Sequence, residues 1–148
     1  MPSEPKKVLR CVVIAPSGKL LDCETSSVAF PAHDGQVNVL YNHMPMLCNL
    51  GLGIMEVKSV PTDSDVVPHS TFLLIDGGIG MISYNMLTII ASDAIYMCDI
   101  EAEKNEEMLE KVRKKLAAGT YTPAHRSHEE RKLSLLTKLK QKSANLPK

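Results

Sequence analysis

Tryptophan is absent from this 148-residue sequence, and Phe30 and Phe72 are its only phenylalanines. Apolar residues still make up 44% of the chain, so Val, Ile, Leu and eight adaptable Met must fill the interior. The longest apolar run falls well short of the ~20 residues that a membrane-spanning helix needs. The composition therefore predicts one folded domain with at most an appendage, and any membrane association through a partner.

Net charge is also lacking, since 17 basic residues balance 17 acidic ones, which argues against bulk attraction to nucleic acid. The balance hides an asymmetry. Residues 1–100 carry five basic and ten acidic residues, a net charge of −5, so the remainder carries +5. That excess lies in the last stretch of the chain, where it could meet an acidic partner.

Cysteine is sparse, and the four residues Cys11, Cys23, Cys48 and Cys98 include no Cys-x-x-Cys pair. They have no histidine pair at zinc-ligand spacing nearby. Three of them lie in apolar runs, which favours mostly buried, reduced thiols over a disulfide framework.

Between Val8 and Met97, short Val/Ile/Leu-rich runs alternate with Gly, Pro, Asp or Asn, the rhythm of an all-β sandwich or barrel. Their close spacing leaves no room for crossover helices, so we expect antiparallel sheets. Asp34-Gly35 and Tyr84-Asn85 are expected as hairpin turns. The ten expected strands are Leu9–Ala15, Leu20–Cys23, Ser27–Pro31, Gln36–Leu40, Met46–Leu50, Gly53–Ser59, Ser70–Asp76, Gly78–Ser83, Met86–Ala91 and Ala94–Cys98.

After Asp99 the composition becomes typical of a helix. Glu101–Ala118 is dominated by Glu, Lys, Leu and Ala and ends at Gly119, which predicts a helix. A second helix follows, started either by Thr122-Pro123 or by a capping box of Ser127 and Glu130. Helices joined by so few residues should fold back as an antiparallel hairpin. Their apolar stripes are narrow, so the docking free energy of the hairpin should be only a few kcal/mol.

Motifs for chemistry are weak. Gly77-Gly78-Ile79-Gly80 is followed by a strand and not by a helix, which favours a tight turn over a nucleotide site. The five histidines lie in expected turns or near the second helix start, with no nucleophile arranged around them. Asp63 and Asp65 lie in a polar loop and are expected to be solvated. The sequence thus names no catalytic residue and no metal ligand.

Three blocks resemble the ε subunit of F-type ATP synthases, which is called δ in mitochondria. Val13–Leu21 is similar to the opening strand and turn of the family. Asp34–Leu47 (DGQVNVLYNHMPML) resembles its Gly-[Glu/Gln]-x-Gly-[Ile/Val]-x-x-x-His-Ala-Pro-Leu signature. Gly77–Ala94 resembles its Gly-Gly-[Ile/Phe] segment and the Val-Thr-[Val/Ile]-Leu-Ala-Asp strand that follows. Departures from the pattern are Asn38 in place of a signature glycine and Met44 in place of the alanine before Pro45.

The resemblance implies an antiparallel β-sandwich of about ten strands over residues 1–98, followed by an antiparallel two-helix hairpin, a regulatory tail, over residues 99–148. It implies a non-catalytic rotor subunit, whose sandwich docks on the γ subunit and rests on the membrane-embedded c ring. We expect c-ring contact through matched loop residues, namely Asp34, Gly35, Gln36, Asn42 and His43.

In the family the hairpin lies folded on the sandwich or extends into the catalytic head, where basic residues meet an acidic loop of the β subunit and block ATP hydrolysis. The basic residues matched to that role here are Arg126, Arg131, Lys132, Lys138, Lys140 and Lys142. Some members sense ATP through an Ile-Asp-x-x-Arg-Ala motif. Here Ile100, Glu101 and Lys104 form a degenerate copy, and lysine lacks the planar fork of arginine, so we expect no cofactor and no ATP sensing.

The leading hypothesis is therefore an accessory, non-enzymatic subunit that couples γ to the c ring during ion-driven synthesis. It touches the membrane only through the c ring and binds no nucleic acid. With no transit peptide visible, we expect the cytoplasmic side of a bacterial plasma membrane. A free-standing β-sandwich adaptor or ligand-binding module with a basic helical tail is the alternative, and an enzyme ranks third.

Overall fold

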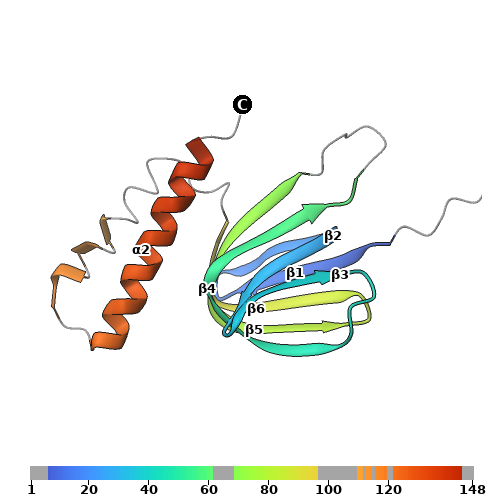
Figure 1. The fold of residues 1–148 in the computed structure, drawn as a ribbon, viewed down its shortest axis with the longest axis horizontal. Coiled ribbons are helices and arrows are strands. Elements are labelled where there is room, and N and C mark those ends of the chain that lie inside the picture. The colour runs from blue at the N-terminus through green and yellow to red at the C-terminus, as the bar shows by residue number, and fades with distance from the viewer. Residues whose placement is uncertain are drawn as a thin grey trace, which may run out of the picture. The chain divides into compact units, whose positions relative to one another are not determined.

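The computed structural model describes residues 7–61, 69–96, 110–111, 113–114, 116–119 and 122–144. The chain divides into two compact units, residues 1–95 and 96–148. Six strands and one complete helix are present in the described chain (Figure 1). They are β1 (Leu9–Ala15), β2 (Gly18–Ala32), β3 (Gly35–Leu40), β4 (Met46–Ser59), β5 (Ser70–Ser83), β6 (Met86–Tyr96) and α2 (Pro123–Ala144).

The strands form one sheet in the order β1-β6-β5-β4-β2-β3, and β1 also pairs with β2. Five strands therefore close into a ring, and β3 is added at the side of β2. Closure removes most free sheet edges. The ring encloses an apolar core in which Phe30, Met55, Leu73, Ile75 and Ile89 are almost completely buried.

The prediction of ten strands is wrong, because four pairs of expected strands are single long strands that bend and continue. β4 and β5 show this most clearly in Figure 1. Their register is the same on both sides of Gly51, since Leu50 pairs with Gly78 and Leu52 with Asp76. Glycines at the bend let a strand pass from one layer to the other without breaking the ladder.

A bulge does the same for β2. Thr25 pairs with Ser59 and Ser27 with Lys58, so Ser26 is the extra residue. The hydroxyl of the fully buried Thr25 lies within hydrogen-bond distance of the carbonyl oxygens of Ser27 and Lys58, and Ser26 Oγ donates to Ser59 O (3.0 Å). Up to Thr25 β2 pairs with β1, from Thr25 onward it pairs with β4, and from Ser27 onward it also pairs with β3.

Two further expectations on the sheet need correction. The glycines Gly77 (φ 69°) and Gly78 (φ 123°) lie inside β5 and are not a turn between strands. The pairing is antiparallel except between β1 and β6, which run parallel, with Arg10 opposite Met86 and Ile14 opposite Ile90. No crossover helix is needed there, because the four intervening strands make the connection. The hairpin turn expected at Tyr84-Asn85 is confirmed. The one expected at Asp34-Gly35 is displaced by one residue, because the turn is His33-Asp34 and Gly35 is the first residue of β3.

The helical region is confirmed in part. α2 begins at Pro123, with Arg126 N–H donating to Thr122 O (3.1 Å), so the Thr122-Pro123 start is right and the Ser127 capping box is wrong. Proline suits the first helical position because its missing N–H would have no partner there. Of the expected helix Glu101–Ala118, residues 101–109, 112 and 115 lie outside the described chain, and the described residues between 110 and 117 are helical.

Candidate functional site

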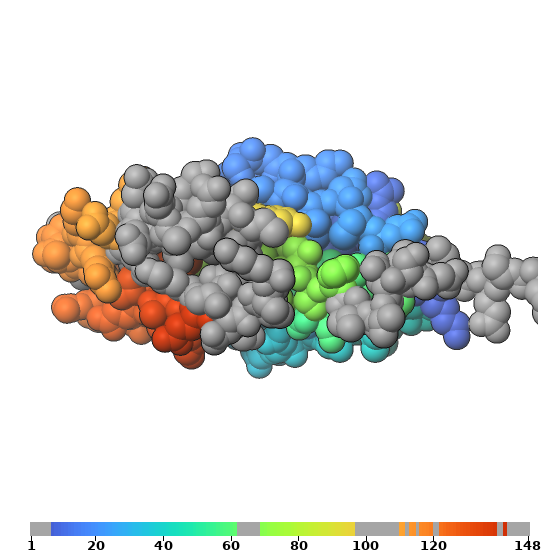
Figure 2. Space-filling view, turned by 90° about the horizontal axis from the view of Figure 1, so that it is seen from above, coloured from blue at the N-terminus to red at the C-terminus, as the bar shows by residue number. Residues whose placement is uncertain are grey.

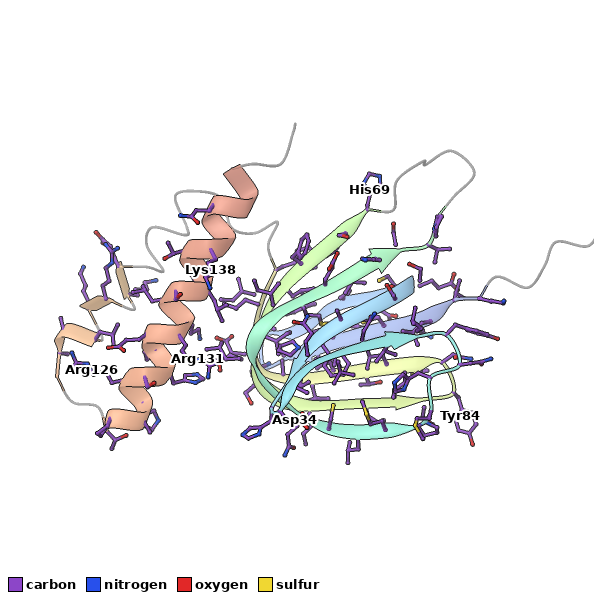
Figure 3. The ribbon with its side chains drawn as sticks, viewed as in Figure 1. Asp34, His69, Tyr84, Arg126, Arg131 and Lys138 are labelled. Carbon is purple, nitrogen blue, oxygen red and sulfur yellow. The ribbon has the colours of Figure 1, made fainter. Side chains whose placement is uncertain are left out.

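The residues expected to contact the c ring fall at opposite ends of β3. Asp34 is in the turn before this strand, whereas Asn42 and His43 are in the loop after it. Six extended residues separate the two ends by about 20 Å. Figure 3 shows the same separation, with Asp34 at one end of the strands and Tyr84, the neighbour of the Asn42 loop, at the other. The structure therefore brings these residues together as two groups and not as one site.

The first group is a polar, acidic turn. His33, Asp34, Gly35 and Gln36 are all exposed, and Gly35 adopts a φ of 144° that favours glycine. The turn is fixed to β4, because His33 N–H donates to Asn49 O (2.9 Å). A carboxylate thus projects from a rigid hairpin.

The second group, at the other end of β3, is tied to the β5–β6 turn. Asn42 N–H donates to Asn85 Oδ1 (2.7 Å), and Asn85 Nδ2 lies 3.4 Å from Asn42 Oδ1. His43 Nδ1 lies 2.8 Å from Met44 O, and because a carbonyl can only accept, Nδ1 carries the proton. Two exposed apolar side chains, Met44 and Tyr84, stand beside these polar groups.

An exposed apolar surface on the outside of the sheet was missed at the sequence level. Ile14 of β1 lies opposite Ile90 of β6, and Leu47 of β4 lies opposite Met81 of β5. Four neighbouring strands contribute to this outer face, and its exposed members are Ile14, Leu47, Ile79, Met81 and Ile90. Large exposed apolar patches usually mark interaction sites. The sequence signal was there, because runs such as Cys11–Ala15 and Ile89–Ala91 are apolar on both faces of a strand.

A charged cluster lies at the surface of β1 and β2, which form one continuous blue area in Figure 2. Asp22 accepts from Arg10 Nε (3.0 Å), Arg10 Nη2 (3.1 Å) and Lys19 Nζ (3.0 Å). Hydrogen bonds from these two cations lower the pKa of Asp22 to about 2. The cluster covers the outside of the β1–β2 pair with compensated charge.

The three described cysteines are free thiols. Cys11 and Cys23 are register partners across β1 and β2, and burial raises the pKa of Cys11 to about 12. Cys11 is therefore protonated and unreactive at neutral pH.

The six basic residues of the tail do not share one face. Arg131 and Lys138, labelled in Figure 3, are exposed and stand two helical turns apart on the same side of α2. Arg126 pairs with Glu130 (3.4 Å), and Lys132 is half-buried. Lys140 and Lys142 lie in α2, but their side chains are outside the description. Leu136, on another side of the helix, is almost completely buried.

The degenerate motif Ile100, Glu101 and Lys104 lies outside the described residues. Within the described ranges, no group of three or more His, Cys, Asp or Glu side chains could hold a metal ion. No described helix is both long and apolar enough to cross a bilayer. The features that the described chain does present are surfaces suited to protein contacts.

Comparison with known proteins gives concordant results. Residues 8–97 match the family described as "ATP synthase, Delta/Epsilon chain, beta-sandwich domain". The chain is 30% identical over 131 residues to the ATP synthase epsilon chain of Lactobacillus gasseri, covering 88% of this chain and 84% of that one.

Two solved structures share the fold. A chain in the cryo-EM structure of the Euglena gracilis mitochondrial ATP synthase (OSCP/F1/c-ring) aligns with a TM-score of 0.64 and 19% identity, over 95% of this chain and 84% of that one. A chain of the Tetrahymena thermophila mitochondrial ATP synthase central stalk and c-ring structure aligns with a TM-score of 0.55 and 12% identity, over 88% and 94%.

Proposed function

This chain belongs to the delta/epsilon chain family of ATP synthases, and on that premise we propose that it is a non-catalytic central-stalk subunit that turns with the rotor. The observation that carries the proposal is the outward apolar face on β1, β4, β5 and β6. A sandwich that has already buried a core gains nothing by exposing several large aliphatic side chains on adjacent strands to water. A permanent partner on that face removes them from solvent, and in this family that partner is the γ subunit.

The Asp34 turn is the end that rests on the c ring. Cytoplasmic loops of membrane proteins are enriched in Lys and Arg, so a projecting carboxylate suits such a loop. Asp34, Gly35 and Gln36 together form a small polar contact surface. The protein meets the membrane only through the c ring. The place in the cell is then the cytoplasmic side of a bacterial plasma membrane, as a peripheral subunit.

The tail acts on ATP hydrolysis. In this proposal the helical residues at 110–117 and α2 form an antiparallel hairpin that can leave the sandwich and reach the catalytic head. The exposed side chains of Arg131 and Lys138 then face an acidic loop of the β subunit. No ATP is bound by the tail, because Lys104 replaces the arginine of the sensing motif.

A single charge on the apolar face tests the docking. Ile90 and Leu40 are both 55% exposed, but Ile90 lies on the proposed docking face and Leu40 on the outer side of β3, a strand that pairs with β2 alone. Ile90→Asp places a carboxylate in an apolar interface and should weaken binding to purified γ subunit at least about tenfold. Leu40→Asp is the matched control and should bind like the unaltered chain.

Binding is measured by calorimetry or by co-purification with γ, and circular dichroism checks that both variants fold. An unaltered chain that never binds γ would sink the rotor assignment and leave the free-standing adaptor as the better description. Equal weakening by Leu40→Asp would instead move the docking face elsewhere on the sandwich.

A further inference from the structure

Backbone strain is concentrated at one end of the sandwich. We call this end the tip and define it as the β3–β4 loop, Tyr41–Pro45, together with the turn Tyr84-Asn85. Among described residues other than glycine, positive φ angles occur at Asn42 (61°), Tyr84 (49°) and Asn85 (58°), and all three are in the tip. Asparagine tolerates this conformation, but for a bulky aromatic residue it is a genuine outlier.

Tyr84 is the least suited of the three to its place. Two-residue hairpin turns with both central residues at positive φ strongly prefer Asn-Gly or Gly-Gly, and an aromatic ring at the first position is unfavourable. The side chain of Tyr84 is 97% exposed, so it buries no area within its own sheet. The strain is therefore not offset by any packing inside the sandwich, which points to a contact with another molecule.

The tip is held in place before any partner arrives. The side chain of Asn85 accepts from Asn42 N–H (2.7 Å), and its backbone carbonyl accepts from Arg10 N–H (2.9 Å). His43 N–H donates to Leu40 O (3.1 Å), which closes the loop turn. Three chain segments are thus tied together, and a rigid anchor loses little conformational entropy on binding.

The apolar surface of the tip continues the proposed docking face. Met44 is 73% exposed, and Leu47, three residues further along, is the register partner of Met81 on the outer face. Met86 directly follows the Tyr84-Asn85 turn and is also exposed. The occupant that fits this continuity is the partner of the face itself, which must extend past the sheet and offer an apolar pocket with a polar group for a phenol.

We infer that Tyr84 is a binding anchor, presented on the strained Tyr84-Asn85 turn and seated in a pocket of the γ subunit. The inference rests on the proposed function, because the same shaft must cover the outer face. Aromatic residues that lie fully exposed in the free protein and become buried in a complex often dominate binding energy.

Tyr84→Gly in the full chain separates anchoring from folding. Glycine accepts φ of 49° without strain, so the midpoint of urea unfolding should stay the same or rise. The dissociation constant for purified γ should nevertheless increase at least about tenfold, as for loss of a hot-spot residue. Tyr84→Phe, which keeps the ring, should recover most of the affinity. Ser17→Gly, in the exposed turn at the far end of β1, is the control and should bind normally.

The binding results distinguish failure of the Tyr84 anchor from failure of the rotor role. If the unaltered chain binds γ and Ile90→Asp does not, but Tyr84→Gly binds with unchanged affinity, the anchor is overturned and the rotor role stands. If no form binds γ, the rotor role fails, and the Tyr84 anchor fails with it. If Tyr84→Gly loses binding only to detergent-solubilised c ring, or only to phosphatidylcholine–phosphatidylglycerol vesicles, the assignment of the anchor to γ is wrong.

Discussion

Asp22 shows how single residues shape the surface of the sandwich. Its carboxylate accepts three hydrogen bonds from Arg10 and Lys19, all on the β1–β2 pair. The folded protein therefore binds a proton at Asp22 less readily than the unfolded chain, in which the carboxyl has an ordinary pKa near 4. A depressed pKa contributes stability that is present above the unfolded value and lost as the pH falls.

We expect the free energy of unfolding to depend on pH through the protonation of Asp22. At pH 6, Asp22→Asn should be less stable than the unaltered chain, and the gap should close as the pH falls from about 4 toward 2, where the folded-state pKa lies. Urea titrations followed by circular dichroism at several pH values measure the gap. Glu24→Gln, two residues further along β2, alters the charge by the same amount and controls for net charge. A gap that persists unchanged at pH 2 would mean that the amide perturbs packing and not the ion pairs.

For the candidate site, the sequence predicted which residues lie in turns but not which of them lie close together in space. The signature residues Asp34, Asn42 and His43 were correctly placed in turns, because Asp, Asn and Gly favour them. Their division between two ends of β3 follows from the length of that strand in space. The hydrogen bond between Asn42 and Asn85, 43 residues apart, depends on tertiary structure and left no local signal.

At the scale of elements, the sequence predicted strand positions well and strand breaks poorly. Nearly every expected strand residue lies in β1–β6, and all four excess breaks fall at bends inside β2, β4, β5 and β6. Gly and Ser signal both turns and bulges, and only the position of the next strand distinguishes them. The start of α2 was one of two alternatives, and proline at the first helical position proved to be the stronger signal.

The bend in β5 depends on Gly78. A Cβ at this position would lie 2.1 Å from Ile90 O and 2.8 Å from Ala91 Cα, both backbone atoms of β6 that cannot move aside cheaply. Gly18 has nearly the same φ, 125° against 123°, but a Cβ there would meet nothing within 4 Å. The two positions therefore separate backbone strain from steric overlap.

We expect Gly18→Ala to lower the free energy of unfolding by about 1–3 kcal/mol, the strain of this φ for a residue with a Cβ. Gly78→Ala should lower it further, by at least about 1–3 kcal/mol more, because β5 and β6 must separate. Urea unfolding of the full chain measures both values. Equal losses in the two variants would show that the overlap with Ile90 is relieved by a small shift, and that the bend is not held by close approach of the strands.

At the scale of the whole molecule, the charge asymmetry of the sequence coincides approximately with a division of the structure. The net −5 of residues 1–100 and the +5 of the remainder correspond approximately to the two compact units, which divide at residues 95 and 96. The outer apolar face was not predicted, because a continuous apolar run such as Cys11–Ala15 indicates that both faces of a strand are apolar but not whether a partner covers the outer one. The γ subunit and the c ring as partners came from the motif resemblance alone, whereas the comparisons show the family.

The proposed inhibition can be tested with single charges on α2 in an assembled enzyme. Arg131→Glu or Lys138→Glu reverses a charge on the exposed side of the helix, whereas Arg126→Glu, the control, alters a residue paired with Glu130. If Arg131 and Lys138 meet an acidic loop, each reversal should raise ATP hydrolysis about two- to fivefold, as expected for loss of ~0.5–1 kcal/mol per exposed ion pair. Deletion of residues 99–148 sets the upper limit of activation.

The activation caused by the charge reversals should shrink with added salt, because salt screens the contact that the unaltered side chains make. Activity that stays constant in all three charge variants and in the deletion would remove the inhibitory role. The sandwich would then couple γ to the c ring without inhibiting ATP hydrolysis.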